Sequence, residues 1–149
     1  MATILFVCKA NRGRSVMSAA YAERLAAGRH RPLSAGSEAD PSETPHPEVI
    51  EAMREVGIDI AEHRAQPLTT GLAAQADAIV TMGCGDACPL IPGKKQLRVD
   101  WDLTDPKDRP LDEVRAIRDD IERRVRELVA ELDRTAPTTT APASWGDGR

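Results

Sequence analysis

The start of the chain constrains the fold more than any other part of the sequence. Residues 3–7 form a short apolar run of the kind that is buried in a parallel sheet, and a turn-rich stretch follows. Ser15 then opens a helical pattern that extends to about Ala27, with Gly28 as its expected C-cap. A buried strand that leads through a short turn into a helix is typical of an α/β protein with a parallel sheet.

The rest of the chain repeats this alternation. The clearest helix covers residues 111–132, where apolar residues recur every three or four positions from Val114 to Leu128. Further strands are predicted at residues 31–35, 77–82 and 96–101, and further helices at 48–56 and 69–75. We therefore expect a three-layer α/β fold, flavodoxin-like, with an open parallel sheet of four strands in the order 2-1-3-4 and helices on both faces.

Length and charge limit the protein class. The 149 residues suit one catalytic domain, expected over residues 1–134, and the Thr/Ala/Pro-rich stretch 135–149 is expected to be a disordered tail. The net charge of −4 gives no reason to expect nucleic acid as a partner. No apolar run suits a membrane span or a signal peptide, so we expect a cytoplasmic protein, as a monomer or weak dimer, whose thiols are reduced.

Two of the three cysteines follow predicted strands on the same side of the expected sheet. In open parallel sheets, ligands bind beyond the carboxyl ends of the strands, where the strand order reverses. Cys8 follows the first strand and Cys84 follows the third, and these strands are neighbours in the expected order. The topology therefore places both thiols at one edge of the sheet. Cysteines in a reducing compartment are more often reactive than part of a disulfide framework.

The segment from Cys8 to Ser15 has the features of an anion-binding loop. A glycine-containing turn before a helix can point successive N–H groups inward, and the helix N-terminus adds positive potential. The Arg14 guanidinium can hold two oxygens of a tetrahedral oxyanion, and the combined field stabilises a thiolate at Cys8. The residues predicted to bind the oxyanion are Lys9, Ala10, Asn11, Arg12, Gly13 and Arg14.

Two polar side chains are expected to support this loop. Ser15 can donate a hydroxyl hydrogen bond to the thiolate, and Asn11 tolerates positive φ and can tie the loop together. The alternative is an inert buried cysteine at a strand end, followed by a basic helix start. The spacing Cys-x5-Arg-Ser between an apolar strand and a helix favours a reactive thiol.

The run Val7-Cys-Lys-Ala-Asn-Arg-Gly-Arg-Ser15 resembles the catalytic loop of low-molecular-weight protein tyrosine phosphatases and of the arsenate reductases that share their fold. Further matches lie at residues 34–37, 46–48, 53–60 and 105–106, so the resemblance covers about residues 3–132. Ala10 stands where glycine is usual, and Gly13 stands where cysteine is frequent. The resemblance implies the phosphatase fold, with Cys8 as the nucleophile and Arg14 as the oxyanion anchor.

The pair Asp105-Pro106 resembles the general-acid loop of this family. The resemblance implies that Asp105 protonates the leaving oxygen after Cys8 attacks. An ordinary Asp-Pro turn is the alternative. The neighbouring aspartates that could act instead, judged by residue type, are Asp100, Asp102 and Asp108.

Aromatic residues help to separate phosphatase from reductase. Phosphatases of this family usually carry aromatic residues just after the Asp-Pro pair, where they flank a phosphotyrosine ring. This chain continues with Lys107 and Asp108, which leaves Trp101 as the one candidate for an aromatic wall. His46 lies in a Pro-rich stretch and is expected to pack at the surface, with capping or lining of the site as the alternative. A phosphatase for a small substrate or for phosphotyrosine is therefore the second candidate function.

The segment with Cys84 and Cys88 resembles the redox loop of thioredoxin-coupled arsenate reductases, although fewer residues separate the two cysteines here. The resemblance implies a relay of three thiols. Cys8 attacks arsenate, Cys84 attacks Cys8 and releases arsenite, and Cys88 then attacks Cys84. Thioredoxin would reduce the resulting disulfide, so the implied reductant is external and no bound cofactor is expected.

Other interpretations of Cys84 and Cys88 remain open. Some relatives use mycothiol with mycoredoxin as the reductant and would not need this pair. A zinc site would need four ligands, and the histidines do not show ligand spacing, so no metal is expected. Two inert cysteines, or an oxyanion- or metalloid-binding sensor without turnover, are the remaining alternatives. Among these candidate functions, the sequence favours an arsenate reductase.

Overall fold

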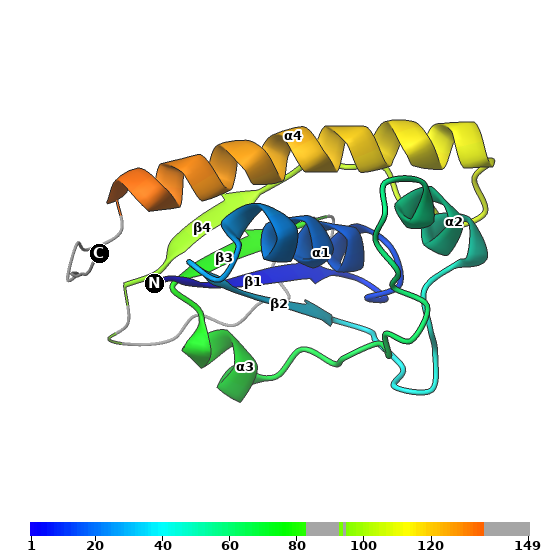
Figure 1. Cartoon of the computed structure of the whole chain (residues 1–149). Helices are drawn as coiled ribbons and strands as arrows, with labels where there is room; N and C mark the ends of the chain where they lie inside the picture. Colours follow the sequence, from blue (N-terminus) through cyan, green and yellow to red (C-terminus); the bar gives the residue numbers. More distant parts are fainter. Residues whose placement is uncertain (83–92, 94, 136–149) are drawn as a thin grey trace.

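Strands and helices alternate along the chain, as the sequence predicts (Figure 1). The computed structural model describes residues 1–82, 93 and 95–135, so Cys84, Cys88 and residues 136–149 lie outside the described part. No helix within that part is long and apolar enough to cross a membrane. The elements are β1 (Thr3–Cys8), α1 (Arg14–Ala26), β2 (Arg31–Gly36), α2 (Pro47–Glu55), α3 (Thr70–Gln75), β3 (Ala78–Thr81), β4 (Leu97–Asp100) and α4 (Leu111–Thr135).

The described strands form a parallel sheet in the order β2-β1-β3-β4, which confirms the predicted topology. At the carboxyl end of β1, Cys8 lies opposite Gly36 of β2, and Val7 lies opposite Thr81 of β3. β2 and β3 lie on opposite sides of β1, so the chain crosses from one side of β1 to the other between β2 and β3. Cys8 therefore lies at the switch point, where open α/β sheets bind their ligands.

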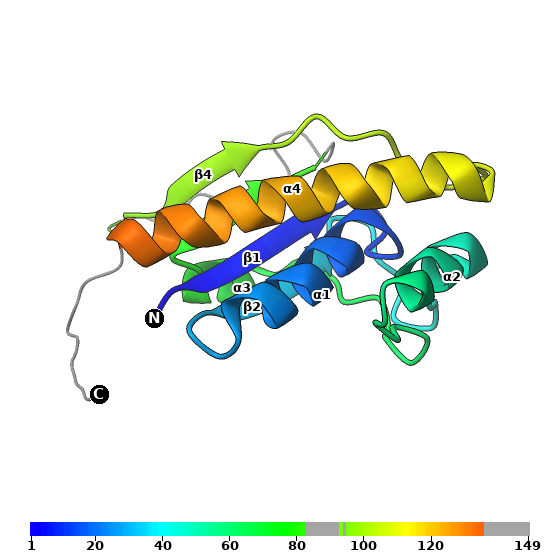
Figure 2. The same ribbon diagram turned by 45° about the horizontal axis from the view of Figure 1, so that its top comes forward.

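Helices cover both faces of the sheet. Figures 1 and 2 show α1 and α4 side by side on one face, α3 on the other, and α2 near the ends of β1 and β2. Side chains alternate along β1, so Ile4 and Phe6 join the core with α1 and α4, while Leu5 and Val7 join the smaller core that includes Ala73 of α3. This two-sided burial explains why β1 is apolar throughout.

Several element boundaries differ from the sequence-based expectation by a few residues. Thr69 is not part of α3 but caps it, because its hydroxyl accepts a hydrogen bond from the Leu72 N–H. The C-cap of α1 is Ala27 rather than Gly28, with φ of 49°, and Gly28 follows with φ of 88°. α4 extends to Thr135, so the stretch expected to be disordered begins with a helical residue.

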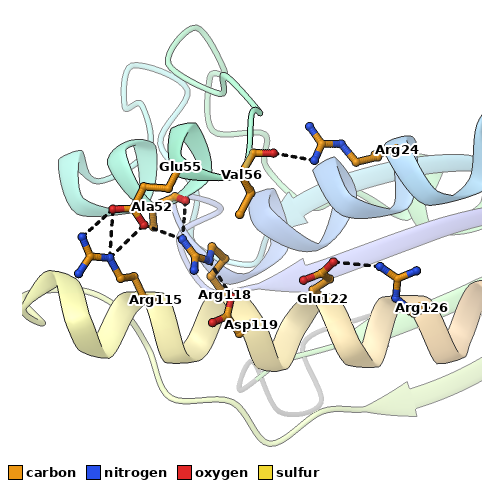
Figure 3. Close-up of polar contacts among 9 residues, drawn as sticks. All are labelled: Arg24, Ala52, Glu55, Val56, Arg115, Arg118, Asp119, Glu122 and Arg126. Carbon is orange, nitrogen blue, oxygen red and sulfur yellow. Dashed lines mark hydrogen bonds and ion pairs between the residues drawn. The ribbon is translucent and has the colours of Figure 1, made fainter.

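An arginine cluster holds the C-terminus of α2 against α4 (Figure 3). Arg115 donates from Nε and Nη2 to the Glu55 carboxylate at 2.6–3.0 Å. Arg118 Nη1 donates to Glu55 Oε1 at 2.8 Å and to the Ala52 carbonyl at 2.9 Å. Arg24 of α1 donates to the carbonyl of the residue just after α2. Carbonyls that lack a partner within α2 are therefore satisfied from two other helices.

Candidate active site

Cys8 lies at the base of the loop that connects β1 to α1. Its side chain is buried, and its Sγ is 2.9 Å from Ser15 Oγ and 3.3 Å from the backbone N of Asn11. Asn11 adopts φ of 57°, which bends the loop back toward the thiol and confirms the predicted left-handed conformation. The loop thus brings two hydrogen-bonding groups to the sulfur.

The Asn11 amide determines the direction of these hydrogen bonds. The backbone N–H of Gln66 donates to Asn11 Oδ1 at 2.8 Å, which identifies the oxygen of the amide. Asn11 Nδ2 therefore donates to Ser15 Oγ at 2.7 Å. Because the Ser15 oxygen accepts this bond, its own proton can point to Cys8 Sγ. Both neighbours of the sulfur can then donate hydrogen bonds to it.

His63 supports the same amide from outside the loop. His63 Nε2 lies 2.9 Å from Asn11 Oδ1, which can only accept, so this imidazole nitrogen carries the proton. Burial lowers the pKa of His63 below its usual value, and the hydrogen bond with Asn11 opposes this shift. Sequence reasoning missed His63, because only the fold brings it to the loop.

The N-terminus of α1 has no side-chain cap. Gly13 is the N-cap residue, and the first turn contains no acidic residue. The helix ladder starts with the bond from the Met17 N–H to the Gly13 carbonyl, so the N–H groups of Arg14, Ser15 and Val16 have no partner within the helix. Such a helix start stabilises a bound anion through its N–H groups and its dipole.

A cavity of about 120 Å³ contains the Cys8 thiol. It is much smaller than the roughly 300–1,000 Å³ that is usual for drug-sized ligands, and it suits a small ion. Charged and polar groups dominate its wall. The lining residues are Cys8, Ala10, Arg12, Gly13, Arg14, Glu43, His46, Asp105 and Lys107.

We call residues 8–15 the oxyanion loop. Arg12 connects this loop to the segment before α2. Its Nε donates to the Thr44 carbonyl at 2.6 Å, and its Nη1 lies 3.4 Å from Glu43 Oε2. The Arg12 carbonyl accepts from the His46 N–H at 3.2 Å. Glu43 and His46 thereby become part of the cavity wall. Glu43 was not singled out from the sequence, and a place in the site was only the alternative interpretation of His46.

Asp105 reaches the cavity from the loop between β4 and α4. Its Oδ1 accepts from the Lys107 N–H at 3.0 Å, and its Oδ2 is 3.5 Å from Nη2 of the buried Arg14. Arg14 Nη1 also donates to the Leu103 carbonyl at 3.4 Å. Of the four aspartates considered from the sequence, Asp105 is the one in the cavity lining. It lies beside the space that a bound oxyanion would occupy.

Two side chains lie elsewhere than the sequence suggested. Trp101 is not an aromatic wall of the site but is buried against Phe6, with ring centroids 6.0 Å apart, because its backbone continues the pairing with β3. His46 is half-buried in the cavity wall rather than at the surface, because it caps α2 beside Arg12. Burial, followed by the Arg12 charge, lowers the pKa of His46.

The predicted loop residues do not all face the cavity. Lys9 is exposed, and its ammonium group lies 3.9 Å from Glu38 rather than in the cavity wall. Lys107 supplies a cationic side chain to the wall instead. Asn11 and Ser15 support the thiol as described, and Ala10, Arg12, Gly13 and Arg14 line the cavity.

The predicted redox pair Cys84 and Cys88 lies outside the described residues. Met82, which precedes it, donates its N–H to the Val7 carbonyl at 2.8 Å, so the chain enters that segment next to the end of β1. Among the residues that the structure describes, no group of three or more His, Cys, Asp or Glu side chains could hold a metal ion.

A thiol between hydrogen-bond donors, in one small cavity with an arginine and a carboxyl group, is the arrangement of an enzyme that attacks a tetrahedral oxyanion through a covalent cysteine intermediate. The family model described as low molecular weight phosphotyrosine protein phosphatase matches residues 3–138. The chain belongs to this family.

Relatives within the family include both reductases and phosphatases. The chain is 35% identical over 133 residues to the glutaredoxin arsenate reductase of Synechocystis sp., and the match covers 89% of this chain and 99% of that protein. The solved thioredoxin-dependent arsenate reductase of Corynebacterium glutamicum matches with a TM-score of 0.76 at 35% identity, covering 91% of this chain and only 63% of that one. The YwlE arginine phosphatase from Geobacillus stearothermophilus matches with a TM-score of 0.75 at 26% identity, over 90% of this chain and 94% of that one.

Proposed function

We propose that this protein is an arsenate reductase in which Cys8 forms a covalent bond to arsenic. The observation that carries the proposal is the cavity at Cys8, which is small and polar and has no aromatic side chain in its described lining except the imidazole of His46. A phosphotyrosine ring would lack stacking contacts that contribute about 0.5–1.5 kcal/mol per pair. Relatives named arsenate reductases, at about a third identity over nearly the whole chain, support the same function.

The first half of the reaction uses the described residues. The Cys8 thiolate attacks arsenic, and one arsenate oxygen leaves as water after accepting a proton from Asp105. Arg14 and the free N–H groups at the start of α1 bind the remaining oxygens. Asn11 and Ser15 hold the sulfur in position through the hydrogen bonds described above.

The second half transfers two electrons from thiols to arsenic. The Cys84 thiolate attacks Cys8 Sγ, a disulfide forms, and the sulfur–arsenic bond breaks with its electron pair left on arsenic. Arsenic(V) thereby becomes arsenic(III) and leaves as arsenite. Cys88 then attacks Cys84 and frees the Cys8 thiolate. The hydrogen bond from the Met82 N–H to the Val7 carbonyl at the end of β1 supports this relay, because Cys84 follows Met82 by two residues in the sequence.

An external thiol must reduce the Cys84–Cys88 disulfide. We propose a dithiol protein of the thioredoxin type, because exchange with a dithiol reduces a disulfide and restores its two thiols. Mycothiol with mycoredoxin is the alternative, in which Cys84 and Cys88 are dispensable. Either reductant acts where thiols are kept reduced, so we propose that the reaction takes place in the cytoplasm.

The test is arsenate-dependent oxidation of NADPH by the reduced protein with thioredoxin and thioredoxin reductase. We expect oxidation that requires arsenate and that falls by roughly a thousandfold or more in Cys8→Ser, because the nucleophile is lost. Phosphate in place of arsenate is the matched control and should give no oxidation. A parallel assay with mycothiol and mycoredoxin identifies the other reductant. Absence of arsenate-dependent oxidation in both systems would refute the proposal.

A phosphatase is the second candidate, and the family and the YwlE match favour it. The same nucleophile, arginine and acid would serve phosphoryl transfer. Efficient hydrolysis of an aryl phosphate, together with weak arsenate turnover, would make this the main function instead.

A further inference from the structure

The candidate oxyanion loop carries a glycine that contacts the loop of the candidate acid. A methyl group added at Gly13 would lie 2.7 Å from Cγ and 3.4 Å from Cδ of Pro106. Non-bonded carbon atoms prefer about 3.5–4.0 Å, so a side chain at residue 13 would displace the proline ring. Pro106 is buried, and its ring is rigid, so the displacement would be passed to its neighbour Asp105.

Arg14, the next residue, holds the same loop through polar contacts. We call residues 102–110 the acid loop. Arg14 Nη1 donates to the Leu103 carbonyl, and Arg14 Nη2 faces Asp105 Oδ2 at 3.5 Å. The Asp105 side chain itself is half exposed, so packing around it does little to fix its position. The acid loop therefore rests on the oxyanion loop through one apolar contact and one arginine.

We propose that Gly13 is a positioning residue for Asp105, because its missing side chain allows Pro106 to seat the acid loop against the oxyanion loop. The proposal rests on the proposed function, in which Asp105 donates a proton to the leaving oxygen. Glycine at this position sets the separation between the acid and the Cys8 thiol. In this chain, where the Pro106 ring occupies the space beside Gly13, a larger residue would move the acid away from the leaving oxygen.

The experiment compares kcat for arsenate among Gly13→Ala, Asp105→Asn and the double variant. We expect Gly13→Ala to lower kcat about tenfold, as a displacement of about 1 Å can cost up to a hundredfold. Asp105→Asn should lower kcat about a hundredfold or more. The double variant should be no slower than Asp105→Asn within twofold, because the glycine acts only through the acid.

Two further variants separate positioning from a general structural effect. Pro106→Ala removes both ring atoms that meet the added methyl group, so Gly13→Ala/Pro106→Ala should recover to the activity of Pro106→Ala alone. Gly71→Ala is the matched control, because its new methyl group would meet only Thr69 Oγ1 at 4.0 Å, and it should keep full activity. Thermal unfolding shows whether each variant is folded. If Gly13→Ala does not fold, Pro106→Ala alone should still lower kcat about threefold in the presence of Asp105 and have no effect in Asp105→Asn.

Several results would overturn the proposal. One is an unchanged kcat in Gly13→Ala. Another is an equal loss of kcat from Gly13→Ala with and without Asp105. The third is a kcat of Gly13→Ala/Pro106→Ala that does not recover to that of Pro106→Ala. A wild-type protein without arsenate turnover would refute the proposed function instead, and the same cycle is then measured with phenyl phosphate, whose leaving group also needs a proton. If neither substrate depends on Asp105, there is no acid to position and the proposal fails.

Discussion

Tyr21 carries a buried hydroxyl without a hydrogen-bond partner among the described residues. Burial, followed by the nearby Glu122 charge, raises the pKa of Tyr21, so the group stays neutral. A buried unsatisfied polar group costs about 1–3 kcal/mol. We therefore predict that Tyr21→Phe stabilises the protein by about 1 kcal/mol, measured as a higher urea midpoint with an unchanged slope.

A second buried hydroxyl serves as the control. Ser18 Oγ donates to the Arg14 carbonyl at 2.8 Å, so Ser18→Ala removes a satisfied group and should give no gain in stability. A lower midpoint in Tyr21→Phe would show that the hydroxyl has a stabilising partner.

For single residues, the sequence predicted the roles of side chains that act within their own segment. The left-handed conformation of Asn11 and the contact between Ser15 and Cys8 follow from a short loop with known residue preferences. His63 was not predicted as part of the site, and for His46 that role was only the alternative to surface packing. Their roles depend on tertiary contacts to Asn11 and Arg12 from distant segments, which no local pattern encodes.

Among the elements, the attachment of α2 to α4 has a clear pH dependence. Hydrogen bonds from Arg115 and then Arg118 lower the pKa of Glu55 from 4.5 to about 2 (Figure 3). A carboxylate whose pKa is lowered by folding stabilises the folded state above its unfolded pKa, and this contribution disappears as pH falls through the folded pKa. We predict that Glu55→Gln is less stable than wild type at pH 7 and pH 5, and that most of the difference is lost as pH falls to about 2.

Urea midpoints across this pH range measure the effect. Glu51→Gln is the matched control on the same helix, because Glu51 is exposed and has no ion pair within the described part of the chain, so its midpoint should follow wild type. A Glu55→Gln deficit that persists unchanged to pH 2 would show that the ion pairs are not its cause.

The sequence predicted which helices and strands form and in which order, and this success has a physical reason. Buried parallel strands and the long amphipathic helix leave strong periodic patterns, and these gave the observed order β2-β1-β3-β4. The arginine cluster at Glu55 was not predicted. It joins residues sixty or more positions apart, through charges that individually look like a solvated helix face.

Across the whole molecule, the candidate site combines one predicted loop with two segments that only the fold brings to it. The oxyanion loop follows β1, Glu43 and His46 precede α2, and Asp105 and Lys107 precede α4. The resemblance to known phosphatases, rather than any pattern of spacing, pointed to Asp105. The exclusion of Trp101 from the site required the structure, since its burial depends on contact with Phe6 of β1.

The central claim is that Cys8 is the first of three thiols that together reduce arsenate. It is tested most directly by mixing reduced Cys88→Ser with arsenate in the absence of any other thiol, followed by mass spectrometry and arsenite analysis. The account predicts one arsenite per protein and a Cys8–Cys84 disulfide that accumulates because the third thiol is missing. Protein that keeps both thiols free and releases no arsenite would contradict it.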